Sequence, residues 1–129
     1  MVISFNKKFV EPILTGSKIH TIREDAKGRW RPGITMHMYT GGRFSKEYRQ
    51  FIEMDCRSVQ DVYMTYYNGK LEVSVDDTLI YGYPERNEFA ISDGFADWED
   101  FEKWWIPILM NDPELKYKGR VIHWTNIKY

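Results

Sequence analysis

The chain has 129 residues, of which 43% are hydrophobic and 16% aromatic. This length is typical of one domain that folds without disulfides or metals, so we expect a single domain over residues 1–129. The net charge of −1 argues against a general nucleic-acid binder that depends on overall positive charge. The single cysteine, Cys56, excludes an internal disulfide. No signal peptide and no apolar stretch of about 20 residues is visible, so we expect a cytoplasmic protein without a membrane partner.

The charges are unevenly distributed along the chain. Residues 1–49 carry ten Lys or Arg and four Asp or Glu, residues 50–115 carry four and fifteen, and residues 116–129 carry four and none. If the basic ends meet in the fold, they form a face that can hold a phosphate or another anionic ligand. The alternative is that the two signs neutralise one another across the fold.

The first element is expected to be a short helix. Phe5, Phe9 and Ile13 recur every four residues and Gly16 follows them, which is typical of one apolar helical stripe ended by a glycine. Pro12 lies inside the stripe, so this helix is expected to be short or irregular.

Most of the remaining chain is expected to form strands. Asn68-Gly69 favours a type I′ hairpin, because both residues tolerate positive φ. Cys56 lies on the apolar side of an alternating segment, where we expect it to be buried. The polar segment 24–33 is expected to be a loop. The predicted strands are 18–23, 34–40, 51–67 as a strand pair or one bent strand, 71–75, a short strand in 78–83, and 119–127.

A second, longer helix is predicted near residues 97–110. Asp97 is a favourable N-cap, and the acidic residues after it suit the positive end of the helix dipole. Pro107 is expected to bend or end this helix. Many strands with one early and one late helix predict an α+β fold, as a small mixed β-barrel rather than a βαβ sheet.

Two segments resemble the ASCH family. Gly16-Ser17-Lys18-Ile19-His20-Thr21-Ile22-Arg23, with Trp30 to Gly33 after it, is similar to the ASCH signature of Gly, Lys, Thr and Arg before a loop that ends in glycine. Ala90 to Phe95, followed by a helix, resembles the family's acidic-Gly-Phe segment, and the closing strand 119–124 is also similar. The resemblance covers most of the chain and implies a PUA-like barrel with a role linked to RNA or nucleosides.

Some small bacterial members of that family are amidohydrolases that remove the acetyl group from N4-acetylcytidine with a Lys, a Thr and a Glu. By this resemblance Lys18 and Thr21 match the first two catalytic residues, and Asp93 stands in place of the Glu. The Asp side chain is one methylene shorter than that of Glu, so the structure has to show whether Asp93 reaches Lys18. Segment 40–83 is also longer than in the compact amidohydrolases. No metal or organic cofactor is implied.

Amide hydrolysis requires a nucleophile, a base and donors for the oxyanion. Burial can lower the pKa of a lysine toward neutrality, so that Lys18 could deprotonate the hydroxyl of Thr21, whereas an acidic neighbour raises that pKa. Arg23 could hold a carbonyl oxygen or a phosphate. On a regular strand Thr21 and Arg23 share one face and Lys18 faces the other way, so Lys18 must precede the regular strand or follow a bulge.

Each candidate also has a plain structural interpretation. Lys18 could be an exposed lysine after a turn, Thr21 an ordinary strand residue, and Asp93 a cap of a turn or helix. Arg23 could pair with a nearby carboxylate. His20, Arg29 and Trp30 lie near the motif and are further candidate binding residues, and Trp30 could stack on a base or serve only as a packing ring. His37 and His123 have no metal-like spacing, so we expect strand residues with hydrogen-bond partners.

Three functions therefore stay open. The first is a pocket that binds RNA or a modified nucleoside, the second is an amidohydrolase acting on N4-acylated cytidine, and the third is a non-catalytic adaptor whose pocket is closed.

Overall fold

The computed structural model describes residues 1–129 and confirms the α+β class. Its helical segments are the short 3-10 helix η1 and three α-helices: η1 (Lys7–Phe9), α1 (Val10–Thr15), α2 (Tyr83–Ser92) and α3 (Trp98–Met110). Its strands are β1 (Val2–Phe5), β2 (His20–Arg23), β3 (Thr35–Thr40), β4 (Arg49–Asp55), β5 (Ser58–Tyr67), β6 (Lys70–Val75), β7 (Thr78–Leu79) and β8 (Lys116–His123).

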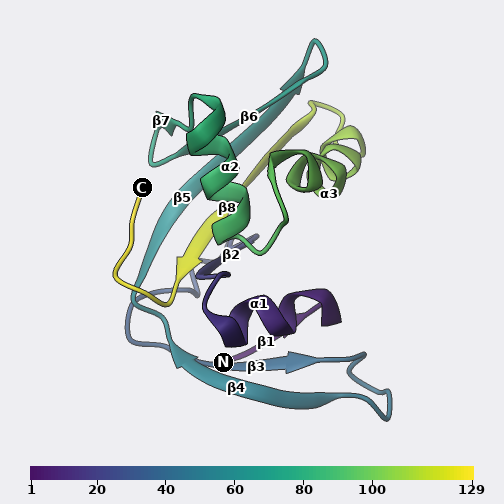
Figure 1. Ribbon diagram of the computed structural model, residues 1–129, viewed down its shortest axis with the longest axis vertical. Helices are drawn as coiled ribbons and strands as arrows, with labels where there is room; N and C mark the ends of the chain where they lie inside the picture. The colour runs from purple at the N-terminus through teal and green to yellow at the C-terminus, as the bar shows by residue number, and fades with distance from the viewer.

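The strands form two sheets. One has three strands in the order β1-β3-β4, and the other has five in the order β2-β8-β5-β6-β7. Figure 1 shows α1 along the three-stranded sheet, and α2 and α3 beside the five-stranded one. No closed barrel is found, so the structure supports the α+β class without showing the barrel.

A bent pair of strands joins the two sheets, as the pattern over residues 51–67 suggested. β4 lies in the small sheet and β5 in the large one, with only Cys56 and Arg57 between them. The backbone N–H of Cys56 donates to Ile34 at 2.8 Å, and that of Arg57 donates to His123 at 2.8 Å. Cys56 is thus bonded to the segment just before β3 of the small sheet, and the next residue, Arg57, is bonded to β8 of the large sheet. Cys56 itself is buried, as predicted.

The hairpin at Asn68-Gly69 is also confirmed. Both residues have positive φ, 52° and 73°, and they join β5 to β6 in antiparallel register. A turn with positive φ at both central residues matches the right-handed twist of the two strands.

The N-terminal prediction was partly wrong. A short helix is present and ends at Gly16 with φ of 87°, but Phe5 belongs to β1 and not to the helix. β1 pairs in parallel with β3, and this ladder overrides the four-residue spacing that suggested a helix from residue 5. Pro12 does not break α1, because it lies in the first turn, where backbone N–H groups have no intrahelical partner.

Three predictions in the C-terminal half need correction. The strand expected in 78–83 covers only Thr78–Leu79, and helix α2 begins at Tyr83. Pro84 lies in the first turn of α2, where proline is favourable. Pro107 does not end α3, which runs to Met110. The last strand covers Lys116–His123 instead of 119–127.

The core is one cluster of 24 buried hydrophobic residues with contributions from both sheets and all the helices. Aromatic rings at the end of β1, in η1 and along α3 belong to it, and several of them also border the cavity described next. No helix is both long and apolar enough to cross a membrane.

Candidate functional site

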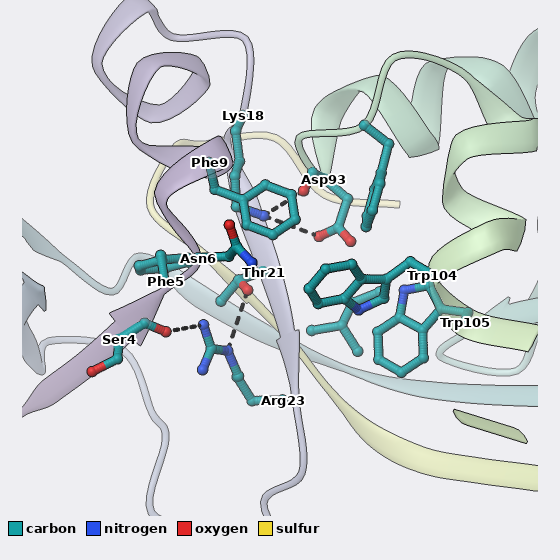
Figure 2. Close-up of a pocket in the computed structure, with 12 residues that line it drawn as sticks. Ser4, Phe5, Asn6, Phe9, Lys18, Thr21, Arg23, Asp93, Trp104 and Trp105 are labelled. Carbon is teal, nitrogen blue, oxygen red and sulfur yellow. Dashed lines mark hydrogen bonds and ion pairs between the residues drawn. The ribbon is translucent and has the colours of Figure 1, made fainter. Parts of the chain in front are cut away.

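A cavity of about 270 Å³ lies where β1, η1, β2 and α3 meet (Figure 2). The three residues that the sequence motif singled out, Lys18, Thr21 and Arg23, all line it. Asp93 lines it as well, so the distant acidic residue and the N-terminal motif come together. The other lining residues are Ser4, Phe5, Asn6, Phe9, Ile22, Phe95, Trp104 and Trp105.

Lys18 precedes the regular strand, as the geometric argument required. Its backbone N–H donates to Pro12 at 3.0 Å, and the N–H of Ile19 donates to Ser92 at 2.8 Å. These bonds tie the segment to the ends of α1 and α2, and β2 begins only at His20. The strand alternation therefore does not apply to Lys18, which reaches the cavity that Thr21 and Arg23 border.

The Lys18 ammonium is buried and surrounded by acceptors. Nζ donates to the backbone carbonyl of His20 at 2.8 Å and to that of Asp93, and it lies 3.6 Å from Asp93 Oδ1. Burial lowers the pKa of Lys18 from 10.5 to about 8, and the charge of Asp93 opposes this shift. Burial thus has a larger effect on the pKa of Lys18 than the ion pair with Asp93 has. A lysine that acts as a base requires this order of the two effects. The exposed-lysine interpretation is excluded by its 2% exposure.

Asp93 occupies the C-cap of α2 and is 3% exposed. Its shorter side chain still reaches Lys18, because the helix end brings the Asp93 backbone against the lysine. Gly94 makes this approach possible: a Cβ there would lie 2.7 Å from Lys18 Cδ and 2.8 Å from Phe9 Cδ1. Asp93 is therefore both a helix cap, as the plain interpretation held, and a partner of Lys18.

His20 contacts the same carboxylate oxygen of Asp93 that lies near Lys18. His20 Nδ1 lies 3.0 Å from Asp93 Oδ1, and Nε2 lies 2.7 Å from the Tyr129 hydroxyl. Burial lowers the pKa of His20, so the ring is neutral near pH 7. A carboxylate only accepts, so Nδ1 carries the proton and Tyr129 donates to Nε2. His20 does not line the cavity.

Tyr129 is held in place by Gln60. Its backbone N–H donates to Gln60 Oε1 at 2.9 Å, and its backbone carbonyl accepts from Gln60 Nε2 at 2.7 Å. His123 also donates from Nε2 to Gln60 Oε1 at 2.9 Å, while its Nδ1 is buried without a partner. His123 is thus a hydrogen-bonded strand residue, as expected, and His37, also on a strand, lies 2.9 Å from Glu53 Oε1.

Arg23 and Thr21 form the other polar end of the cavity. Arg23 Nε donates to Thr21 Oγ1 at 3.4 Å, and one terminal nitrogen donates to the backbone carbonyl of Ser4 at 2.7 Å. The guanidinium carbon lies 4.8 Å from the centre of the Phe5 ring. Arg23 forms no ion pair, so one terminal nitrogen is free for a ligand. Figure 2 shows Thr21 between Arg23 and Lys18.

Aromatic rings border the cavity on two sides, and sequence reasoning did not assign them to it. Phe5 and Phe9 lie on one side, and Trp104 and Trp105 of α3 lie across from Phe5 (Figure 2). Trp104 is 37% exposed and Trp105 is 5% exposed. Nothing in the sequence of α3 indicates that these two tryptophans border a cavity with β2.

Besides His20, two predicted binding residues do not line the cavity. Arg29 is exposed in the loop after β2, and Trp30 is 8% exposed in the hydrophobic core. Their backbone N–H groups donate to the carboxylate of Asp25, which organises this loop. Neither side chain lines the cavity, so the packing interpretation fits Trp30 better than base stacking at this site.

The side chains that line the cavity suit an organic ligand better than a metal ion. No group of three or more His, Cys, Asp or Glu side chains is arranged to hold a metal ion. What converges instead is a buried amine, a hydroxyl, a guanidinium and a carboxylate beside aromatic rings. Comparison of the chain with protein families, curated proteins and solved structures found no match.

Proposed function

We propose that the chain is an ASCH-type domain of PUA-like fold whose cavity binds a pyrimidine nucleoside, free or as an exposed nucleotide of RNA. The observation that carries the proposal is the convergence of Lys18, Thr21, Arg23 and Asp93 on one cavity with aromatic walls. A cavity of about 270 Å³ suits one heterocycle with part of its sugar rather than a larger ligand.

The aromatic walls favour a flat ligand. Phe5 and the α3 tryptophans border the same space from different sides, and stacking of a base on an aromatic ring is worth about 1–3 kcal/mol. Trp104 is partly exposed, so it can contact the ligand at the cavity mouth.

The polar groups match the edge of a cytosine. Its exocyclic amino group is a donor, and its ring carbonyl is an acceptor. Asp93 Oδ2 has no hydrogen-bond partner within the protein and can accept from the amine, while the free nitrogen of Arg23 can donate to the carbonyl. This complementarity favours a cytidine over an adenosine, which has an amino group but no ring carbonyl.

One observation favours the amidohydrolase as a second candidate. The pKa of Lys18 is lowered to about 8, and a neutral amine retains two N–H groups for the carbonyls of His20 and Asp93. Both groups line the cavity, and the amine lone pair can accept the proton of the Thr21 hydroxyl when the bound substrate brings the two groups together. Thr21 attacks the acyl carbon of an N4-acylcytidine, and the proton passes from Lys18 to the leaving N4 nitrogen. Water then hydrolyses the acyl ester of Thr21 and releases the carboxylic acid.

The adaptor is the least supported of the three functions. For an adaptor we expect a closed pocket at Lys18, whereas the Lys18 side chain borders a cavity.

The test is calorimetric titration of the protein with cytidine and N4-acetylcytidine. Saturable binding is expected, and Arg23→Met weakens it about tenfold, because one charge-assisted hydrogen bond is worth ~1.5–3 kcal/mol. Lys27→Met is the control, since Lys27 is an exposed cation in the loop after β2 that does not line the cavity. Absence of binding to both ligands contradicts the proposal.

Proton NMR of the same mixtures separates the two candidates. Release of acetate by the wild-type protein, abolished in Thr21→Val with binding retained, supports the amidohydrolase. Binding of N4-acetylcytidine without release of acetate removes the hydrolase and leaves the nucleoside-binding function.

A further inference from the structure

A second cavity lies on the other side of the η1–α1 segment. It has a volume of about 620 Å³ and opens between this segment and the end of the β3–β4 hairpin. Neighbouring residues of the chain face the two cavities: Asn6 and Phe9 line the first, and Lys7 and Val10 line the second. In Figure 1, α1 lies above the hairpin that closes this second cavity. Its volume is within the range of small-ligand sites.

Three cations border this cavity without an anionic partner. Lys7 comes from η1, Lys46 from the hairpin loop and Arg49 from the start of β4. Glu11 and Glu47 border it too, yet none of these five side chains forms an ion pair. Oppositely charged groups that share a cavity without pairing leave both their donors and their acceptors available to a ligand.

Thr40 is the buried polar residue of this cavity. It ends β3, lines the cavity and is 6% exposed. Its hydroxyl has no hydrogen-bond partner, which is unusual for a buried polar group and carries a free-energy cost. A ligand oxygen would satisfy the hydroxyl after rotation about one side-chain bond.

We propose that this second cavity is a binding site for a sugar phosphate, free or as the ribose phosphate of an RNA strand. Lys7, Lys46 and Arg49 hold the phosphate, which carries up to two negative charges near pH 7. The carboxylates of Glu11 and Glu47 accept hydrogen bonds from the sugar hydroxyls, a role that acidic residues take toward ribose in dinucleotide sites.

The mixed charge of the lining favours this ligand over a simple anion. Three cations against two carboxylates leave only a small positive excess, so a phosphate ion alone would be repelled by both glutamates. A sugar phosphate carries both a negative charge for the cations and hydroxyl donors for the carboxylates. The site is separate from the nucleoside cavity and does not depend on the function proposed for it.

The test follows amide NMR shifts of the full chain during titration with ribose 5-phosphate. Saturable shifts are expected at Thr40, Gly41 and Arg49, with affinity falling several-fold between 50 and 300 mM salt. The double variant Lys46→Gln/Arg49→Gln is expected to bind at least about tenfold more weakly, because it loses two charge-assisted contacts. Thr40→Val should weaken binding without lowering the thermal midpoint, since the native hydroxyl has no partner to lose.

Arg43→Gln is the matched control for charge. Arg43 is exposed in the same hairpin loop but does not line the cavity, so its replacement should leave affinity within about twofold. No saturable shift with ribose 5-phosphate, or an equal loss in Arg43→Gln, overturns the proposal. Equal affinity for inorganic phosphate or for ribose without phosphate also overturns it.

Comparison of a short single-stranded RNA with DNA of the same sequence identifies the source of the sugar phosphate. Binding of RNA at least tenfold tighter than ribose 5-phosphate, through the same amides and dependent on the 2′-hydroxyl, indicates an RNA strand. Equal or weaker binding of RNA indicates a free sugar phosphate. Because these titrations report on residues 40–49, loss of nucleoside binding at Lys18 would leave the result unchanged.

Discussion

At the scale of single residues, the balance of forces on Lys18 decides what the first cavity can do. Burial lowers its pKa and the charge of Asp93 raises it, and the result is about 8. A group with this pKa is mostly protonated at pH 7 but has a substantial neutral fraction. If Lys18 is a base, the rate of hydrolysis rises with pH up to about 8 and is then constant.

Replacement Asp93→Asn tests this balance directly. NMR titration of the lysine side chains should show one midpoint near pH 8, and the variant should lower it by on the order of 1 pH unit, because the stabilising charge is lost. Glu88→Gln is the control, since Glu88 is an exposed acid on the same helix that does not affect the pKa of Lys18. A midpoint near 10.5 would mean that burial does not dominate, and a shift to higher pH in Asp93→Asn would mean that the charge of Asp93 does not raise the pKa of Lys18.

The sequence pointed to part of this residue network and not to the rest. Lys18, Thr21 and Arg23 were found because they are close together in a recognisable motif. Asp93 was found only through its own motif, and its link to His20 spans 73 residues. The Tyr129 hydroxyl is 109 residues from His20 in sequence, and no local pattern carries information about such a contact.

At the scale of elements, the turn between α2 and α3 determines whether Lys18 can lie where it does. Gly94 has φ of 102° and contacts Lys18 and Phe9. Gly33 has a similar φ of 96° but nothing within 4 Å of its Cβ position. Both glycines therefore have a positive φ that disfavours a side chain, and they differ only in how closely other atoms approach the position of a Cβ.

Gly94→Ala and Gly33→Ala should consequently differ in cost. Both variants lose about 1–2 kcal/mol of folding free energy, because a side chain is strained at positive φ. Gly94→Ala should lose about 1–3 kcal/mol more through overpacking against Lys18 and Phe9. Urea denaturation measures both values. Equal losses would show that Lys18 and Phe9 adapt to the added methyl group without cost.

Elements with a strong local pattern were predicted well, and those held by tertiary contacts were not. The Asn68-Gly69 hairpin and the Asp97 cap of α3 depend on local chemistry, and both are present. Helix α2 was missed, because only Phe89 and Ala90 of its ten residues are buried and it shows little apolar periodicity. Phe5 was misplaced because its spacing fits a helix, while its partner in β3, Thr40, lies 35 residues away.

At the scale of the whole molecule, the two basic ends of the chain do meet. β2 pairs with β8, with Arg23 opposite Arg120. Arg120 is ion-paired, at 3.2 Å from Asp61 and 4.0 Å from Asp25, whereas Arg23 is not. The charge distribution allowed either a basic face or mutual neutralisation, and each applies in part. Carboxylates neutralise Arg120, whereas Arg23 remains available to the cavity.

The buried histidines make the stability of the whole fold dependent on pH. Burial lowers the pKa of His123 from 6.5 to about 4, so between these values the unfolded chain binds a proton that the folded chain does not. The free energy of unfolding should then fall, by on the order of 2 kcal/mol from this residue, as the pH decreases from 6.5 to 4. In His123→Gln this part of the slope should vanish, whereas His37→Gln should keep it, since His37 is on the surface beside Glu53. Urea denaturation at pH 7, 5.5 and 4.5 gives the slopes. An unchanged slope in His123→Gln would assign the acid sensitivity to His20 or to the carboxylates instead.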